Sequence, residues 1–396
     1  MKKKVLFITN NFWPENFRSN DIVNIISQKY DVSVLTGYPT YPTKEKFKNI
    51  NLNDNFITNS KFKIYRVPTT RKTFNKFSTI INYISFIFLG SFLGTFLIKE
   101  KKFDYVICFA SSPIYQALLS LLFSKLKKSK SILWIQDIWP ETLIELGYIK
   151  NKYLIMALNK SIAFLYKKHD LILTQSKEYY MHLNKNYKNC NYLFNPCDKF
   201  DSEINTPKNI NFNKDYKYLV YSGNIGDAQN FDLILEAASI LKSEKLKFLL
   251  IGSGSKFKYI ENKIKDNFLY NVELHEAISK KELSFVLQRA DVLFISLKQN
   301  QISRFVIPAK FQTYTFFGKP ILCQTDGDVK KMILDYKCGF VINNEKIESM
   351  VGELKKIINT KTEDLNRMGQ QSNLIYNNYF NDKVFLKSLV SILDEI

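Results

Sequence analysis

The feature that most constrains the fold is a repeated alternation of short apolar runs with longer helical stretches. The apolar runs lie at 3–10, 31–37, 62–68, 103–110, 131–137, 170–176 and 191–196, and again at 218–224, 247–254, 271–277, 290–297, 320–325 and 338–343. Short apolar strands that alternate with helices form parallel, doubly wound sheets. The sequence therefore predicts an α/β chain with two successive sheets of this kind.

Composition and length divide the chain further. Its 396 residues exceed one ordinary core, so two domains are expected. Residues 200–217 are polar and rich in Asn and Lys, which is typical of a linker. We predict a Rossmann-like N-terminal domain over 1–199, a Rossmann-like C-terminal domain over 218–375, and a C-terminal helix over 376–396. Ligands in such sheets bind at the carboxyl ends of strands, so we expect a cleft between the halves.

The charge indicates a polyanionic partner or surface. The net charge is +20, and most of the lysine-rich runs fall in the first half. A membrane surface with anionic lipid and a merely solvated basic face both explain this pattern. Nucleic acid is not expected, because no recognition helix, zinc finger or RNA-binding signature is present. The five Cys are far apart and the three His are scattered, so we expect a reducing compartment and no metal site.

An apolar stretch at 79–98 is almost long enough to span a bilayer, and Lys and Arg flank it. Asn82, Gly90 and Gly94 interrupt it. We favour a helix that lies in the membrane interface, ahead of a core helix and, last, a true span. The first apolar run, VLFITN, is too short for a cleavable secretory signal.

Residues 298–328 indicate a phosphate site. They combine Arg304, Pro308 and Lys310 with a half-apolar helical stretch that Gly318 should end. A helix N-terminus carries partial positive charge and free N–H groups, which suits a phosphate. Arg304 and Lys310 add full charges beside it. The unit is therefore predicted to hold a phosphorylated ligand at the rim of the sheet.

Two glycine-containing turns follow strands in the second half. In YSGNIG, Gly223 and Gly226 would let the backbone approach a ligand and leave amides free for a phosphate. Gly252 and Gly254 resemble the start of a dinucleotide fingerprint, but Phe257 replaces the third glycine, so a nicotinamide site is not expected. For both turns an ordinary strand-to-helix connection is the alternative.

In the first half, three loops carry candidate site residues. Asp137 ends a buried strand and opens the sequence DIWPE, where it could orient an acceptor hydroxyl or accept its proton, or simply cap a helix. Trp139 and Glu141 stand beside it. We expect acceptor-binding residues at Trp139 and Glu141 and in the loops after the first and second strands, with surface loops as the alternative for the latter: Trp13, Glu15, Arg18, Tyr38 and Tyr41.

Asp326 and Asp328 flank Gly327 after an apolar run. An Asp-x-Asp pair can hold a divalent cation on a diphosphate. The pair comes late in the chain, however, after the helix-and-strand unit at 298–328. We therefore predict a turn and no metal.

Several segments together resemble family 4 glycosyltransferases of the GT-B fold. They resemble the branch that includes fucosamine-type transferases of O-antigen and capsule assembly. The matching stretches, in family order, are NNFWPENFRSND, SVLTGYPTYP, ICFASSP, IQDIWPE, LFNPCD, YSGNIGDAQNFDLILEAASIL, LLIGSGSK and VIPAKFQTYTFFGKPIL. The resemblance implies a retaining transfer without cofactor or required metal. It also implies that the C-terminal helix packs back on the N-terminal domain.

The resemblance carries over a set of donor-binding residues. These are Gly223, Asn224, Gly226, Gln229, Gly252, Gly254, Ala277, Pro308, Lys310 and Thr313. The chain departs from the family at several of these positions. The family's Arg and Lys of the glycine-rich loop map to Asn224 and Gln229, and its Glu-x7-Glu pair maps to Phe305 and Thr313. Much of the diphosphate charge should then fall on Lys310 and Arg304.

The sequence thus predicts a glycosyltransferase with Asp137, Lys310 and Arg304 as catalytic residues. It would move a sugar, an N-acetylated hexosamine, from a UDP-sugar to a polyprenyl-diphosphate-linked saccharide. Such an enzyme would be cytoplasmic and peripheral on the inner face of the plasma membrane. Two alternatives stay open. One is a UDP-sugar 2-epimerase of the same fold, and the other is a non-catalytic scaffold on the membrane surface.

Overall fold

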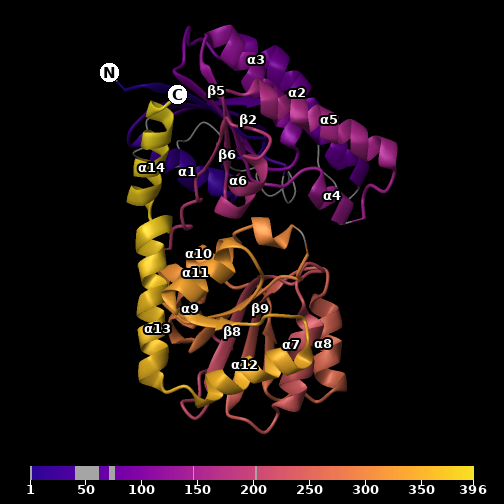
Figure 1. Ribbon diagram of the computed structural model, residues 1–396, viewed down its shortest axis with the longest axis vertical. Helices are drawn as coiled ribbons and strands as arrows, with labels where there is room; N and C mark the ends of the chain where they lie inside the picture. Colours follow the sequence, from indigo (N-terminus) through magenta and orange to yellow (C-terminus); the bar gives the residue numbers. More distant parts are fainter. Residues whose placement is uncertain (1, 41–61, 71–75, 146, 201–202, 301) are drawn as a thin grey trace. The chain divides into compact units, whose positions relative to one another are not determined.

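Each half of the chain forms its own parallel sheet (Figure 1). The computed structural model describes all residues except 1, 41–61, 71–75, 146, 201–202 and 301. The chain divides into two units. The N-terminal unit comprises Met1–Asn195 and Phe385–Ile396, and the C-terminal unit comprises Pro196–Val384. The sequence had placed the second domain at 218–375. The structure also assigns the described part of the 200–217 segment, which contains no helix or strand before Lys217, to the C-terminal unit.

In the described part of the N-terminal unit, seven parallel strands are ordered β3-β2-β1-β4-β5-β6-β7. The order reverses between β1 and β4, so the loops that follow these two strands diverge at the carboxyl edge, where such sheets bind ligands. The strands are β1 (Lys4–Ile8), β2 (Asp31–Gly37), β3 (Lys63–Val67), β4 (Tyr105–Ala110), β5 (Lys130–Ile135), β6 (Leu171–Thr174) and β7 (Cys190–Tyr192).

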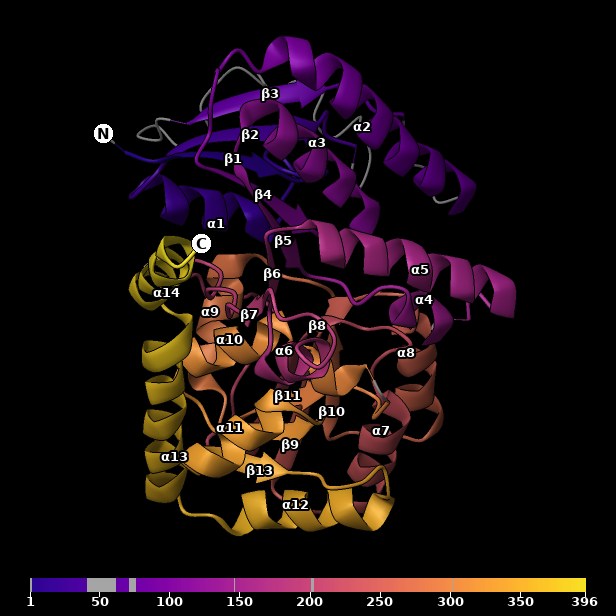
Figure 2. The same cartoon turned by 45° about the horizontal axis from the view of Figure 1, so that its top comes forward.

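Helices cover both faces of this sheet (Figure 2). They are α1 (Arg18–Ser27), α2 (Lys76–Leu97), α3 (Ala117–Lys127), α4 (Glu141–Glu145), α5 (Lys152–Lys168), α6 (Lys177–Leu183) and the greater part of α14 (Asp382–Asp394). On one face α14 completes the core, because the Phe385 ring stacks on Trp134 with 5.7 Å between centroids. Leu389 and Leu393 join the same cluster. On the other face α2 and α3 pack around Phe86 and Phe123.

The helix predicted at 79–98 is α2, and its two sides differ. Its inner side is buried at every fourth residue: Asn82, Phe86, Gly90, Gly94 and, just past its end, Ile98. The glycines allow close packing, since a Cβ would lie 3.1 Å from Leu119 at Gly90 and 2.8 Å from Phe123 at Gly94. Its apolar window, Ser78–Leu97, is long enough to cross a membrane by length and composition.

The outer side of α2 is exposed and apolar. We call it the α2 stripe, and it consists of Ile80, Ile84, Phe88, Phe92 and Phe96, which are 54–70% exposed. The helices α3 and α5 expose further large apolar side chains: Leu118, Leu126, Tyr153, Leu154, Met156 and Phe164. Because α3 contacts both α2 and α5, the three helices form one layer over the sheet (Figure 2). Monomeric soluble proteins rarely expose so much contiguous apolar surface.

In the described part of the C-terminal unit, six parallel strands are ordered β10-β9-β8-β11-β12-β13. The strands are β8 (Lys217–Asn224), β9 (Leu246–Ser253), β10 (Val272–His275), β11 (Val292–Ser296), β12 (Ile321–Gln324) and β13 (Gly339–Val341). The helices are α7 (Phe231–Ile240), α8 (Phe257–Asp266), α9 (Lys280–Arg289), α10 (Ala309–Phe316), α11 (Asp328–Tyr336), α12 (Ile347–Asn359) and α13 (Thr362–Ile375). The strand order reverses between β8 and β11.

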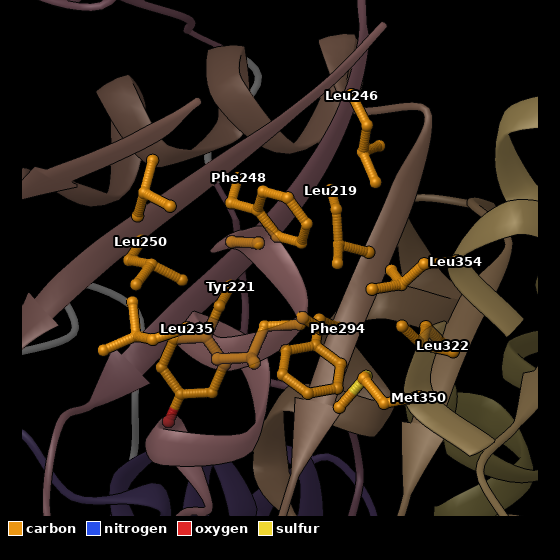
Figure 3. Close-up of a cluster of buried hydrophobic side chains, with 14 of the residues drawn as sticks. Leu219, Tyr221, Leu235, Leu246, Phe248, Leu250, Phe294, Leu322, Met350 and Leu354 are labelled. Atoms are coloured by element: carbon orange, nitrogen blue, oxygen red, sulfur yellow. The ribbon is translucent and has the colours of Figure 1, made fainter. Parts of the chain in front are cut away.

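Local sequence explains several of these boundaries. Ser279 and Glu282 form a reciprocal capping box that begins α9. Gly318 has φ +60° and follows the last turn of α10, as the predicted helix stop requires. The core of the unit lies between the sheet and its helices, and Figure 3 shows Tyr221, Phe294 and Leu322 among its buried side chains.

Candidate functional site

The ammonium group of Lys310 is buried at the carboxyl end of β8. Its Nζ lies 3.7 Å from the centroid of the Tyr221 ring. A Cβ at Gly223 would come within 3.3 Å of the same nitrogen, so the glycine leaves room for the cation. Among the described residues, Nζ has no hydrogen-bond partner. A buried cation without an anion is costly. The site therefore gains most from a ligand that brings negative charge.

Two tyrosines that the sequence analysis did not single out hold this lysine in place. Tyr221 is fully buried, and its hydroxyl donates to the carbonyl of Asn224. Tyr314, one turn after Lys310 in α10, accepts a hydrogen bond of 3.0 Å from the amide of Ser222. The end of β8 and the first turns of α10 are thereby tied together. No sequence pattern distinguished these tyrosines from the many other aromatic residues of the chain.

Burial lowers the pKa of Lys310 to about 7. The ordinary value is about 10.4, so between these two values the unfolded chain binds a proton that the folded chain does not. Stability must therefore rise with pH through this window. We expect the wild type to gain thermal stability relative to Lys310→Met as the pH increases from 7 to 10. Melting curves of the two proteins at matched pH would test this, and parallel pH profiles would contradict it.

The expectation that YSGNIG leaves its amides free is wrong for two of its residues. The amide of Ile225 donates to the carbonyl of Ser253 at 2.8 Å. The amide of Gly226 donates to Oε1 of Gln229 at 3.0 Å. The sequence could not show this, because the first partner lies in the turn after β9 and the second in a side chain that folds back. Asn224 also lies against Gln229, with 3.4 Å between Nδ2 and Oε1.

Gly252 and Gly254 are explained by the approach of two loops. A Cβ at Gly252 would lie 1.8 Å from the carbonyl oxygen of Gly223, and a Cβ at Gly254 would lie 2.2 Å from that of Ile225. The turn after β9 therefore packs directly against the turn after β8. This matches the plain-turn alternative for the Gly-x-Gly sequence.

We expect Gly252→Ala to destabilise the protein and displace the turn that carries Gly223. A methyl group 1.8 Å from a carbonyl oxygen cannot be accommodated without moving backbone. Overpacking of this kind costs about 1–3 kcal/mol. Gly352→Ala is the matched control, since its site in α12 has no atom within 4 Å and helical Ala is favoured over Gly by about 1 kcal/mol. Thermal melting should show a loss for the first variant and none for the second.

The other predicted donor residues lie on the same unit. Arg304 is exposed in a short 3-10 helix, Ser303–Phe305, with its guanidinium carbon 4.9 Å from the Phe305 ring centroid. Pro308 directly precedes α10, and Thr313 is buried in that helix. Ala277 is exposed in the loop after β10.

The Asp-Gly-Asp sequence forms a turn between β12 and α11. Asp326 pairs with Lys330 at 3.3 Å, and Asp328 begins α11. Gly327 has φ +77°, and a Cβ there would lie 1.8 Å from the carbonyl oxygen of Arg304. The turn therefore supports the backbone that carries Arg304.

In the N-terminal unit, Asp137 joins two loops at the carboxyl edge. Its Oδ2 accepts hydrogen bonds of 2.7 Å from both the amide and the hydroxyl of Ser112, in the loop after β4. Trp139 donates from Nε1 to the same hydroxyl at 3.1 Å. The pKa of Tyr83 in α2 is raised by burial and by the charge of Asp137, so α2 passes near this carboxylate. Glu141 is exposed at the start of α4.

The remaining candidates follow β1 and β2 in the sequence. Glu15 is only 2% exposed, and its carboxylate accepts from the amide of Thr40 and from Asn11, both at 2.8 Å. We expected Glu15 to contact the acceptor, but its buried carboxylate instead holds the loop after β2 through Thr40. Trp13 is half-buried, and Tyr38 is 44% exposed. Arg18 begins α1. Tyr41 lies outside the described residues.

A buried polar network at the sheet edge was missed by sequence reasoning. The amide of Asn10, after β1, donates to Gln116 Oε1 at 3.0 Å. The side chain of Asn10 reaches Oδ1 of Asn82 in α2 at 3.4 Å, and Asn82 donates in turn to the carbonyl of Thr70. The polar residue that interrupts the apolar stretch therefore anchors α2 to the edge of the sheet.

Residues 202–374 match the family model described as Glycosyl transferases group 1. A relative from Pseudomonas aeruginosa, named as the glycosyltransferase WbjE, is 22% identical over 222 residues, which are 52% of this chain and 54% of that protein. A relative from Escherichia coli K12, named as the colanic acid biosynthesis glycosyl transferase WcaI, is 26% identical over 119 residues, 30% and 29% of the two chains. The chain thus spans 54% and 29% of the lengths of these curated relatives.

Solved structures resemble the chain over its full length. The crystal structure of Alr3699/HepE from Anabaena in complex with UDP and glucose has a TM-score of 0.68 at 10% identity, and the match covers 100% of both chains. Sucrose-phosphate synthase from Thermosynechococcus elongatus has a TM-score of 0.74 at 10% identity, over 100% of this chain and 99% of that chain. The predicted fold, GT-B with two Rossmann-like units, is confirmed.

Proposed function

We propose that the chain is a retaining glycosyltransferase that uses a nucleotide-diphospho-sugar. The observation that carries this proposal is the buried Nζ of Lys310, which has no hydrogen-bond partner among the described residues and lies at the carboxyl end of β8 beside Gly223. As the nucleotide diphosphate leaves, negative charge grows on its outer phosphate. A cation already desolvated at that position stabilises this charge more than it stabilises the substrate.

The pKa of Lys310 suits such a ligand. In the ligand-free protein burial holds the pKa at about 7, so the amine is largely neutral at slightly alkaline pH. A diphosphate that arrives beside it favours the charged form and raises the pKa. Donor binding is then coupled to uptake of a proton by Lys310. Arg304, exposed on the same edge of the unit, supplies a second positive charge.

The acceptor is proposed to be a polyprenyl-diphosphate-linked saccharide, and the sugar an N-acetylated hexosamine from a UDP donor. Polysaccharide synthesis is supported by the resemblance to fucosamine-type transferases and by the name of one relative, the colanic acid biosynthesis glycosyl transferase WcaI. Asp137 would position the acceptor hydroxyl through its second carboxylate oxygen, because Ser112 occupies the first. We propose that no metal or cofactor is required.

We also propose that the N-terminal unit lies on the inner face of the plasma membrane. The α2 stripe is the supporting observation, together with the charge of its neighbours. The helices α2, α3 and α5 contain no Asp or Glu and seven Lys. Apolar side chains among lysines suit the surface of an anionic bilayer. The inner side of α2 packs on the sheet and on α3, which favours a helix in the interface over one that spans.

The experiment that tests the activity is a donor screen with purified full-length chain. UDP-, GDP- and TDP-sugars are offered with a short polyprenyl-diphosphate sugar acceptor, with and without EDTA. Transfer from one donor that survives EDTA is the expected result. Interconversion of a UDP-sugar without acceptor would identify an epimerase instead. A folded protein that binds no nucleotide by calorimetry would contradict both and leave the scaffold.

A further inference from the structure

Gln116 lies where the strand order of the N-terminal sheet reverses. It is fully buried in the short 3-10 helix Ile114–Gln116, directly after the loop that follows β4. The neighbour of β4 in the sheet is β1, and Asn10 belongs to the loop that follows β1. The side chain of Gln116 therefore lies between the two loops that diverge at the carboxyl edge. The proposed function gives it no role.

Both polar atoms of the Gln116 side chain bond to loop backbone. Its Oε1 accepts from the amide of Asn10 at 3.0 Å. Its Nε2 donates to the carbonyl of Ser111 at 2.7 Å and to that of Pro113 at 3.2 Å. A fully paired amide is held firmly when it is buried, because each bond that broke would leave a polar group unpaired away from water. One neutral side chain thus links the loop after β1 to the loop after β4.

The two carbonyls that Gln116 holds flank Ser112. Ser112 donates from both its amide and its hydroxyl to Oδ2 of Asp137, each at 2.7 Å. The same hydroxyl accepts from Nε1 of Trp139 at 3.1 Å. The carboxylate of Asp137, which follows β5, is therefore held from the loop after β4 and not by its own segment alone.

A single peptide group connects Gln116 with Asp137. The carbonyl of Ser111 and the amide of Ser112 belong to the same peptide bond, and this bond is planar. Its oxygen accepts from Gln116, and its N–H donates to Asp137. The direction of the N–H is therefore set once the oxygen is bound. Hydrogen bonds at both ends also polarise the peptide group, which strengthens its bond to the carboxylate.

We infer that Gln116 is a positioning residue for sugar transfer, which fixes the carboxylate of Asp137 through the Ser111–Ser112 peptide. The inference rests on the proposed function, in which Asp137 positions the acceptor hydroxyl. Gln116 is fully buried and does not itself touch the substrate. A displacement of about 1 Å in a reacting group can cost on the order of 10²-fold in rate, so a side chain outside the site can control transfer.

Gln116→Met removes the hydrogen bonds and keeps nearly the same length and volume of the side chain. The matched control is Asn189→Leu. Nδ2 of Asn189 donates to the carbonyl of Tyr166 at 3.2 Å and to that of His169 at 2.8 Å, just before β7 at the amino edge of the sheet. The control also removes an amide that bonds two backbone carbonyls. It therefore separates a general loss of stability from an effect on Asp137.

The indole of Trp139 reports on Ser112 without any need for activity. The chain contains three Trp, so isotope-labelled tryptophan gives three indole N–H signals in an NMR spectrum, and Trp139→Phe assigns the relevant one. We expect Gln116→Met to shift this signal and to speed its hydrogen exchange at least tenfold, because the bonded Ser112 hydroxyl is no longer held. Asn189→Leu should leave it unchanged. An unchanged Trp139 signal in Gln116→Met would overturn the inference.

A double-mutant cycle on the transfer reaction tests whether the effect passes through Asp137. Gln116→Met should lower kcat by about 10–100-fold and leave the KM for the nucleotide-sugar unchanged, because the donor residues lie on the other unit. In an Asp137→Asn background the same replacement should have no further effect, since residues that act as one unit are not additive. Equal losses in both backgrounds would indicate a merely structural role and refute the inference.

The outcomes distinguish failure of this inference from failure of the proposed function. A kcat that falls in Asp137→Asn but not in Gln116→Met would refute the inference alone. An enzyme that is fully active as Asp137→Asn would refute the role proposed for Asp137, and the role of Gln116 with it. A chain that transfers no sugar would refute the glycosyltransferase, and the Trp139 signal would still decide whether Gln116 holds Ser112.

Discussion

Lys310→Met should reduce kcat by on the order of 10²-fold or more, as expected when a preorganised donor to a developing negative charge is removed. The Nζ of Lys310 is buried, lies against Tyr221 and Gly223, and has no hydrogen-bond partner among the described residues. Methionine matches the length of the aliphatic chain and removes only the charge. The core should therefore remain packed while the leaving diphosphate loses its cation. Steady-state kinetics with the donor found in the screen would measure the effect.

The role of Lys310 can also be tested without measuring turnover. At pH 8 the amine of Lys310 should be mostly neutral before UDP binds and charged afterwards, because its ligand-free pKa is about 7. Calorimetry in two buffers with different ionisation enthalpies should then report uptake of about one proton in the wild type and none in Lys310→Met. The exposed Lys346→Met in the C-terminal unit is the control. A fully active Lys310→Met enzyme would refute the role of this residue.

The double variant Phe88→Glu/Phe92→Glu should lose binding to anionic vesicles by on the order of 10²-fold or more. Burying a phenylalanine side chain contributes about 1.5–3 kcal/mol, and a carboxylate adds repulsion from anionic lipid. The two rings are 70% and 59% exposed on the α2 stripe, so their replacement should not disturb the core. Co-sedimentation with vesicles of phosphatidylglycerol and phosphatidylcholine would measure the change.

The matched control is Phe268→Glu/Tyr270→Glu, which places the same two charges at aromatic residues that are 65% and 77% exposed on the C-terminal unit. It should bind vesicles like the wild type. Raising the salt concentration should weaken the wild-type interaction only in part, because the apolar contribution is not screened. If Phe88→Glu/Phe92→Glu bound as tightly as the control, the α2 stripe would not be the membrane-binding face.

The sequence was sufficient for the fold because its signals are local. The described strands lie at the predicted apolar runs, and Gly318 ends α10 where its sequence context requires. A buried parallel strand is continuously apolar, whatever its neighbours are. Lys310 could also be selected as the central cation, since it follows Pro308 at the predicted start of a helix.

The candidate sites depended on contacts between distant residues. The amides of Ile225 and Gly226 looked free in the sequence, but Ser253 and Gln229 accept from them. Glu15 likewise became a loop contact through Thr40.

The apolar stretch at 79–98 shows most clearly which properties the sequence determines and which ones only the tertiary structure decides. Its composition determined that a long apolar helix would form, and that a membrane was a candidate partner. It did not determine which side faces outward, because both sides of α2 are apolar. That was decided by Asn82, which bonds to the edge of the sheet, and by Gly90 and Gly94, which allow α3 to pack closely. Hydrophobicity is set residue by residue, whereas exposure is set by the partner that each side of a helix meets.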